Sequence, residues 1–316
     1  MDRFVPNRFQ VIVPFFEDHD TLPDLIESLV LVGVEPASIS VVLSGPRRNI
    51  FEIRDRYKIE LICSDGPLTP SQARNLGGKR ATADYIAFLD ADTVVTESWA
   101  DALNEVASQS AVLLTGDTCH ISRDPSWIEK SWFSQIEKLK SSYINGANII
   151  VKRSFFLELN GFDEDLETGE DYDFSIRASK LGVEPKLDDR FFVYHEGYPK
   201  TAKEFYRREK WHATGDLGSF SAFFKSKVMW ASTLYIFCLF VLIAAALTFQ
   251  PEYFLIAILI MFFISISLTL YKFGWNKAVL TNSVIMNIYL GGRGMALAKK
   301  LLKPSTFFRK PSLNPK

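Results

Sequence analysis

The sequence has little of what marks a secreted or a zinc-stabilised domain. It contains three cysteines in 316 residues, Cys63, Cys119 and Cys238, and they are widely spaced with no CxxC pair. An odd number without such a pair indicates neither a disulfide framework nor a zinc site, and it fits a reducing compartment. The sequence also has no internal repeat and no low-complexity tract.

A signal-peptide core is missing too. The first ten residues carry charge and proline, and the apolar run that follows ends at Glu17. An apolar core of that length is too short for a secretory signal. We therefore expect the N-terminal half to stay in the cytoplasm.

The net charge is only −1, but it is unevenly distributed. Residues 225–316 contain eleven Lys or Arg and one acid, Glu252, so they carry about +10 and residues 1–224 carry about −11. The acidic half has no basic stripe interleaved with aromatic residues, which argues against nucleic-acid binding. The composition predicts two domains, residues 1–224 and residues 225–316.

Two long apolar runs, residues 228–249 and 253–273, indicate a membrane protein. Each is long enough to cross about 30 Å of hydrocarbon as a helix. The link between them has no basic residue, whereas lysines flank the outer ends of both runs, at positions 225, 227, 272 and 277. By the positive-inside rule both outer ends face the cytoplasm, which predicts a hairpin in the cytoplasmic (inner) membrane.

A third segment, residues 278–298, is interrupted by polar residues, glycines and Arg293. These interruptions favour an interfacial or re-entrant helix over a third span. A third span would place the basic tail, which includes Lys299, Lys300 and Arg309, outside the cell, against the positive-inside bias. The tail is typical of a segment that lies against anionic headgroups.

The first 224 residues alternate short β-type runs with amphipathic stretches. The runs are residues 9–13, 38–43, 59–63 and 85–89. Four successive βα units predict an α/β fold with a mostly parallel sheet and helices on both faces. Such sheets bind ligands at the carboxyl ends of their strands.

Asp90 and Asp92 follow the apolar run 85–89 directly. Two carboxylates one residue apart at a strand end hold a divalent hard cation, which neutralises a departing diphosphate. The DxD pattern occurs four times in this chain, and this is the pair that ends a buried-type strand in the βα series. A structural turn or helix N-cap is the alternative interpretation.

A helix that starts near Glu170 places Asp171, Phe174, Ala178 and Leu181 on one inward face. A carboxylate held on the buried side of a first turn suits the removal of a proton from an acceptor hydroxyl. Alternatively, the acids of this turn only complement the helix dipole.

His195 ends the strand-like run 190–195, where imidazole reaches the same crevice as Asp92 and completes a metal site. A structural histidine is the alternative. Arg207, Arg208 and Lys210 follow in a basic, aromatic stretch. They are expected either to close over phosphates or to form a cationic collar against the membrane.

Taken in order, these motifs resemble the family 2 glycosyltransferases, which have a GT-A (Rossmann-like) fold, here followed by a membrane region. The resemblance covers about residues 8–216, through VIVPFFED, ARNLG, YIAFLDADT, NGANIIVKRS, LNGFDE, GEDYDFSIR and VYH. It implies an inverting, hexosyltransferase-type enzyme that uses a nucleotide diphosphate sugar and Mg²⁺ or Mn²⁺.

The resemblance also assigns roles to individual residues. It implies that Asp171 is the catalytic base and that Asp90, Asp92 and His195 hold the metal. The residues expected to bind substrate are Pro14, Phe16, Glu17, Arg74, Asn75, Asp90, Glu170, Arg207, Arg208 and Trp211. Glu17 stands where the family usually has Asn, and RREKW (207–211) matches only the Trp of the family's QxxRW motif. The family's base-contacting Asp after the second strand is missing here, where the chain reads Leu43-Ser44-Gly45-Pro46, so the base is left open. A UDP-sugar is the first expectation, and GDP- and dTDP-sugars are the alternatives.

The hairpin predicts an acceptor at the cytoplasmic membrane face, either a lipid-linked sugar or a surface polysaccharide. Two spans are few for a polymer channel, which favours a single addition over processive synthesis. The alternative function is a catalytically inactive membrane scaffold that keeps the nucleotide-binding fold.

Overall fold

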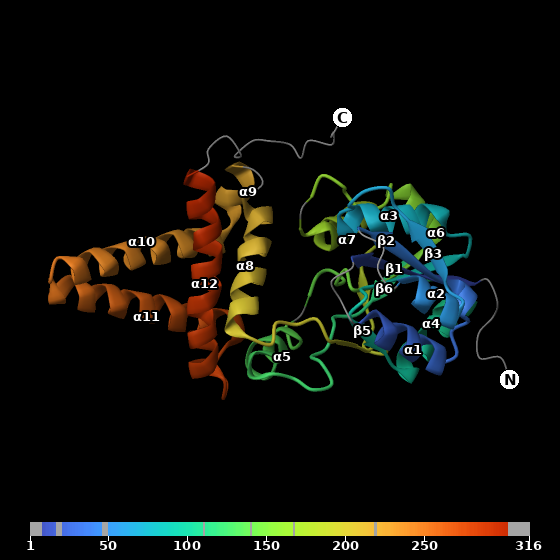
Figure 1. Cartoon of the computed structure of the whole chain (residues 1–316), viewed down its shortest axis with the longest axis horizontal. Coiled ribbons are helices and arrows are strands. Elements are labelled where there is room, and N and C mark those ends of the chain that lie inside the picture. The colour runs from blue at the N-terminus through green and yellow to red at the C-terminus, as the bar shows by residue number, and fades with distance from the viewer. Residues whose placement is uncertain are drawn as a thin grey trace. The chain divides into compact units, whose positions relative to one another are not determined.

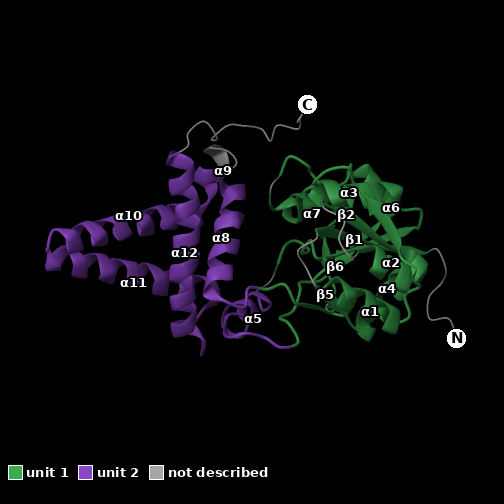
Figure 2. Cartoon of the chain, in the orientation of Figure 1, with its two compact units in different colours: residues 1–123, 140–198 green, residues 124–139, 199–316 purple. Residues whose placement is uncertain are grey.

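The computed structural model describes residues 8–16, 21–45, 50–109, 111–139, 141–166, 168–217 and 220–302. The predicted substrate residue Glu17 and the basic tail beyond residue 302 lie outside this part of the chain. The chain forms two compact units (Figure 2). The first is Met1–Arg123 with Lys140–Tyr198, and the second is Asp124–Leu139 with Pro199–Lys316.

The first unit is built on a seven-stranded sheet in the order β3-β2-β1-β4-β7-β6-β8. Its strands are β1 (Phe9–Phe16), β2 (Ile39–Ser44), β3 (Glu60–Cys63), β4 (Tyr85–Leu89), β6 (Leu114–Gly116), β7 (Asn148–Lys152) and β8 (Lys186–Leu187). β7 runs antiparallel to both of its neighbours, and the other pairs are parallel. A separate pair joins β5 (Thr93–Val95) to β9 (Val193–His195).

Helices cover both faces of the sheet (Figure 1). The helices of this unit are α1 (Leu22–Leu31), α2 (Ile50–Tyr57), α3 (Pro70–Arg80), α4 (Glu97–Gln109), α6 (Arg153–Glu158) and α7 (Glu170–Lys180), with a short 3₁₀ turn η1 (Pro36–Ser38). One face of the sheet forms a core with α1 and α4, and the other forms a core with α3, α6 and α7. The predicted α/β fold, a mostly parallel sheet with flanking helices, is confirmed.

Strand order reverses at β1, because β2 and β3 lie to one side of it and β4 lies to the other. The connections that follow β1 and β4 therefore lead to opposite sides of this point in the sheet. This is the position at which open α/β sheets bind their ligands.

The described part of the second unit is helical. It contains η2 (Glu129–Phe133), α5 (Ser134–Ile136), α8 (Ala202–Asp216), α9 (Phe220–Lys225), α10 (Lys227–Leu247), α11 (Pro251–Phe273) and α12 (Val279–Leu302). α10 and α11 are long and apolar enough to cross a membrane. They correspond to the predicted runs 228–249 and 253–273.

The third predicted segment is one continuous helix, α12, that runs across the base of the α10–α11 hairpin (Figure 1). The Asn287 side chain joins it to both helices, because its Oδ1 accepts hydrogen bonds from Tyr235 Oη (2.9 Å) and Ser265 Oγ (2.8 Å). Tyr235 lies in the first half of α10 and Ser265 in the second half of α11, so both contacts are near the base.

Residues 124–139 belong to the second unit, and the buried side chain of Trp132 makes several of their contacts with it. Its ring lies edge-on to Phe205 of α8 (5.5 Å between centroids) and to Phe273 of α11 (5.0 Å). It also contacts Tyr289 of α12 at 5.4 Å, and the Lys272 ammonium lies 5.0 Å from its centroid. One aromatic side chain thus connects α8, α11 and α12.

Candidate active site

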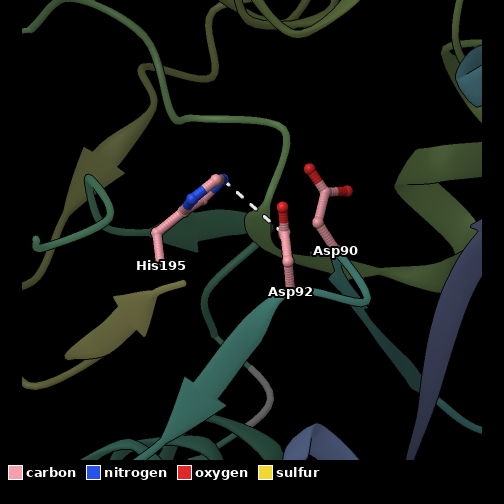
Figure 3. Close-up of side chains that lie close together, drawn as sticks. All are labelled: Asp90, Asp92 and His195. Carbon is pink, nitrogen blue, oxygen red and sulfur yellow. Dashed lines mark ion pairs between the residues drawn. The ribbon is translucent and has the colours of Figure 1, made fainter. Parts of the chain in front are cut away.

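The acidic pair Asp90 and Asp92 lies where β4 ends, at the edge of the sheet. All five residues of β4 are buried, and the chain turns immediately after Leu89. The turn is closed by Thr93, whose backbone N–H and hydroxyl both donate to the Asp90 carbonyl, at 3.1 and 2.8 Å. The turn leads into β5 and presents the two carboxylates beside each other (Figure 3).

Pairing of β5 with β9 brings His195 to the same place. The two strands are antiparallel, with Thr93 opposite His195. The His195 Nε2 atom lies 3.6 Å from Asp92 Oδ1, and its ring stacks on Tyr198 with 4.3 Å between centroids. The strand pairing thus brings together two residues that are far apart in the chain.

Asp90, Asp92 and His195 form a group that fits a divalent cation. One candidate ligand atom from each lies within 4.8 Å of the other two. Asp92 Oδ1 and His195 Nδ1 are buried without a hydrogen-bond partner. Buried polar atoms normally have a partner, and an ion supplies one for a carboxylate oxygen.

Arg74 of α3 connects the acidic pair to the start of α7. Its guanidinium is almost fully buried and donates to Asp90 Oδ1 and to Glu170 Oε1, both at 2.7 Å. Burial alone would lower the pKa of Arg74, but the two carboxylates hold it above its usual range. The side chain is therefore a permanent cation that orients both carboxylates.

Asp171 is the second residue of α7 and is partly buried. Its Oδ2 accepts from the Gly146 N–H at 2.9 Å and its Oδ1 from the Tyr172 N–H at 2.8 Å. Burial raises the pKa of Asp171 and the adjacent charge of Glu170 adds to the rise, while these two hydrogen bonds and the charge of Arg74 oppose it. The carboxylate is thus held in one orientation and made more basic.

The inward face predicted for α7 is present at Phe174 and Ala178, which are fully buried. Leu181, expected on the same face, is 54% exposed instead. The helix ends at Lys180, so the helical spacing no longer applies to Leu181.

Asn75, predicted to lie near a diphosphate, is buried against the turn at residues 161–164. Its Nδ2 donates to the Phe162 carbonyl and to Glu164 Oε1, both at 2.8 Å, and its Oδ1 accepts from the Phe162 N–H. The side chain therefore holds this turn next to α3.

The remaining predicted substrate residues fall into two groups. Pro14 and Phe16 lie at the carboxyl end of β1, and the Phe16 side chain is 47% exposed. Arg207, Arg208 and Trp211 lie on α8 of the second unit. Arg207 and Trp211 are exposed, whereas Arg208 donates to the buried Glu209 at 2.7 Å.

Sequence reasoning missed Asp117 and His120, which follow β6. Asp117 is buried to 8% exposure, and its Oδ2 lies 3.5 Å from His120 Nε2. The signal was present but weak, because the apolar run 111–114 is followed by Thr115 and Gly116 before Asp117. Asp117 was not predicted because it is a single acid and not part of a DxD motif.

A family model described as "Glycosyl transferase family 2" matches residues 10–160. The glucosyl-dolichyl phosphate glucuronosyltransferase of Haloferax volcanii is 24% identical over 186 residues, which is 53% of this chain and 58% of that protein. The amylovoran biosynthesis glycosyltransferase AmsB of Erwinia amylovora is 27% identical over 199 residues, 55% of this chain and 64% of that protein. The chain thus matches less than two thirds of the length of either relative.

Among solved structures, the mannosyltransferase PcManGT from Pyrobaculum calidifontis, in complex with GDP-Man and Mn²⁺, is similar over most of this chain. The TM-score is 0.59 at 16% sequence identity, and the superposition covers 95% of this chain and 88% of that one. At this level of identity the likeness concerns the fold.

Proposed function

We infer that this chain, a member of the family 2 glycosyltransferases by its domain at residues 10–160, moves a sugar from a nucleoside diphosphate sugar to an acceptor hydroxyl. One observation carries this proposal: Arg74 links the metal-binding group at the end of β4 to the carboxylate pair at the start of α7. A metal site for the leaving diphosphate and a base for the acceptor thus share one edge of the sheet.

Asp92 and His195, with Asp90, are the residues that would hold Mg²⁺ or Mn²⁺. Such an ion, when bound, neutralises the diphosphate as the bond to the sugar breaks. Asp90 Oδ1 already accepts a hydrogen bond from Arg74, so this oxygen is less available to a metal ion. We assign Asp92 as the principal ligand for that reason.

Asp171 is proposed as the base. Its two backbone hydrogen bonds aim the carboxylate, and its raised pKa suits the acceptance of a proton from a hydroxyl. The acceptor oxygen then attacks the anomeric carbon opposite the departing diphosphate. A single displacement of this kind inverts that carbon.

The donor nucleotide is proposed to bind between the ends of β1 and β4, where the strand order reverses. Pro14 and Phe16 would contact the base and ribose there, and Asp90 and Glu170, which the buried Arg74 holds, would form the inner wall. Arg207, Arg208 and Trp211 of α8 stay predicted substrate residues. A UDP-sugar remains the first candidate for the donor.

The second unit is proposed to anchor the enzyme in the cytoplasmic membrane through two full spans. Exposed aromatic rings lie at both ends of the hairpin: Trp230 and Tyr271 near its base, and Phe249 and Tyr253 at its tip. At 1.5 Å per helical residue the two levels are about 28 Å apart, which matches the hydrocarbon thickness of a bilayer. Aromatic rings favour the two membrane–water interfaces.

α12 is proposed to lie in the interface at the base of this hairpin. It exposes Leu280, Val284, Met295, Leu301 and Leu302, while Lys299 and Lys300 lie in its last turn. An apolar stripe with terminal lysines favours the headgroup region. By the positive-inside rule the lysines at the base favour the cytoplasmic side for that end, where the acceptor would be a lipid-linked sugar or a surface polysaccharide.

The test is donor turnover by the full chain in detergent, with UDP-, GDP- and dTDP-sugars, with and without Mn²⁺. Asp171→Ala should abolish most transfer and leave donor affinity nearly intact, because a base acts in the transition state. Asp189→Ala is the matched control, because Asp189 is exposed. Equal turnover in Asp171→Ala and Asp189→Ala would contradict the assignment of the base.

An inactive scaffold is the competing function. It predicts nucleotide binding that is independent of metal, with no product from any donor. The unpartnered oxygen of Asp92 and the oriented carboxylate of Asp171 favour the enzyme instead.

A further inference from the structure

The loop that precedes β7 runs along one side of α7. The Ile144 N–H donates to Ser175 Oγ at 3.3 Å, and the Gly146 N–H donates to Asp171 Oδ2 at 2.9 Å. Asp171 and Ser175 have i, i+4 spacing, so they lie on the same side of the helix, one turn from each other. Two side chains of α7 therefore hold two backbone N–H groups of one loop, and the first of these side chains is the proposed base.

Ser175 and Ile144 are both fully buried. Ile144 belongs to the core that also contains Phe174 and Ala178 of α7. A buried backbone N–H needs an acceptor, and Ser175 Oγ supplies one for Ile144. A hydroxyl thus stands on the buried face of α7, among apolar side chains, at the position where the loop has a donor to satisfy.

Gly146 lies close to both of the charged groups beside it. A Cβ built on it would lie 3.3 Å from Arg74 Nη2 and 3.4 Å from Asp171 Cβ. The loop backbone therefore passes next to the guanidinium and the base, and its N–H reaches the carboxylate because no side chain intervenes. A displacement of the loop would lengthen this hydrogen bond.

The far end of the loop is attached to the turn of the acidic pair. The Asp90 N–H donates to the Ala147 carbonyl at 3.4 Å, and the Ala147 N–H donates to Asn145 Oδ1 at 3.0 Å. The Asn148 N–H donates to the Asn145 carbonyl at 3.0 Å, which closes a turn at the start of β7. The loop thus connects the turn of the proposed metal ligands to the base, and Ser175 fixes it to α7 one turn beyond that base.

Several effects of opposite sign act on the Asp171 carboxyl group. Burial raises the pKa of Asp171, and the charge of Glu170 on its own helix adds to the rise. The Gly146 N–H, the Tyr172 N–H and the charge of Arg74 on α3 lower this pKa. Loss of the Gly146 hydrogen bond would therefore make the carboxyl group harder to ionise.

The groups that face Asp171 from other elements leave the contribution of the loop distinct. Burial raises the pKa of the Cys119 thiol, after β6, and nearby carboxylates that include Asp171 add to the rise, so this thiol stays neutral. The loop, residues 143–147, contains no charged side chain, and its Tyr143 ring lies edge-on to Tyr172 with 5.6 Å between centroids. Among the effects on Asp171, the Gly146 hydrogen bond is the one that depends on the loop.

We propose that Ser175 is a positioning residue for the base, because it holds the Ile144 N–H and so keeps the Gly146 N–H on the Asp171 carboxylate. This inference rests on the proposed function, in which Asp171 accepts the proton of the acceptor hydroxyl. Ser175 takes no part in the proton transfer and acts through the loop. A purely structural hydroxyl would affect stability and leave the protonation of Asp171 unchanged.

The experiment is a pH–kcat profile of the full chain with Ser175→Ala, which removes the acceptor of the Ile144 N–H. The Gly146 hydrogen bond should weaken, so the acid limb should move to higher pH by about half a unit or more. The plateau kcat should fall about tenfold, because the carboxylate is less well aimed, while the donor KM stays within about twofold. Ser175→Thr, which keeps a hydroxyl acceptor, should restore most of the wild-type profile.

Two control variants separate positioning from stability. Ser179→Ala removes a hydroxyl one turn further along α7, which bonds to the Ser175 carbonyl and to Glu184, and it should leave the limb in place. Thr115→Val breaks a buried hydrogen bond to the Lys186 carbonyl (2.8 Å) outside the loop, so it should lower stability and not move the limb. The proposal is wrong if the limb stays in place in Ser175→Ala, or if Thr115→Val moves it equally.

Ser175→Cys serves if the alanine variant does not fold, because a thiol is readily buried and accepts hydrogen bonds only weakly. It should shift the limb in the same direction. Carbon-13 NMR of the aspartate-labelled chain, with Asp171→Asn to identify the resonance, follows the Asp171 carboxyl group without turnover. A higher pKa in the Ser175 variant than in the wild type would support the proposal even if the chain transferred no sugar, and an equal pKa would refute it. Absence of turnover in the wild type counts against the proposed function alone.

Discussion

The carboxylate of Asp92 occupies the space that a side chain at position 197 would need. A Cβ built on Gly197 would lie 1.7 Å from Asp92 Oδ2, far inside van der Waals contact. The Glu196 N–H also donates to the Asp92 carbonyl at 2.7 Å, so the backbone after β9 encloses the acidic residue. Position 197 therefore controls the orientation of the proposed principal metal ligand.

Gly197→Ala should displace the Asp92 carboxylate and lower Mn²⁺ affinity by about 10–100-fold, the usual effect of disturbing the support of a ligand. Titration calorimetry with Mn²⁺ measures the change. Gly66→Ala is the matched control, because a Cβ at Gly66 would meet nothing within 4 Å. Equal affinities in the two variants would show that Asp92 does not hold the ion.

Arg74→Met should lower the free energy of unfolding by about 3–5 kcal/mol, because it leaves Asp90 and Glu170 partly buried without their shared cation. Urea denaturation of the full chain measures this loss. Arg74→Lys keeps the charge but not the forked geometry, so it should fall between the wild type and Arg74→Met. A methionine variant as stable as the wild type would mean that the bridge does not stabilise the fold.

The raised pKa of Asp171 predicts the pH dependence of turnover. Below that pKa the carboxyl group holds its own proton and cannot accept another, so kcat falls as the pH decreases through it. The fall should begin at a higher pH than the ordinary aspartate value of about 3.9 would allow. A pH–kcat profile at saturating metal and donor measures this limb.

Glu170→Gln gives a specific check on the cause of that limb. The charge of Glu170 is one of the two effects that raise the pKa of Asp171. Its removal should therefore move the acid limb to lower pH. A limb that stays in place would assign the titration to another group.

Asn287→Ala should weaken the attachment of α12 to the hairpin. The substitution removes the acceptor shared by Tyr235 and Ser265, and polar contacts of this kind between membrane helices contribute about 0.6–2 kcal/mol. Unfolding by SDS in mixed micelles measures the difference. Thr248→Ala is the control, since its hydroxyl bonds to the Ala244 carbonyl of its own helix. Indistinguishable stabilities would contradict a bracing role for Asn287.

Local sequence patterns predicted the strands and helices of the fold and the acidic pair of the candidate site. The run 85–89 was identified as a buried strand because it is apolar throughout, and Asp90 and Asp92 follow it directly. Local patterns could not predict that Arg74 bonds to Asp90 and Glu170, because these residues lie 16 and 96 positions away in the chain. The pairing of β5 with β9 was likewise hidden, because a three-residue strand carries too little pattern to indicate its partner.

The sequence by itself determined the alternation of strands and helices, the acidic pair at a strand end and the two long apolar helices. Each of these depends on residues that are close together in the chain. The tertiary structure decided that β5 pairs with β9 and so brings His195 to Asp92, that Arg74 joins Asp90 to Glu170, and that Asp117 lies on the same sheet edge as Asp90. Those relationships depend on which strands become neighbours, and strand order arises from the packing of the whole core.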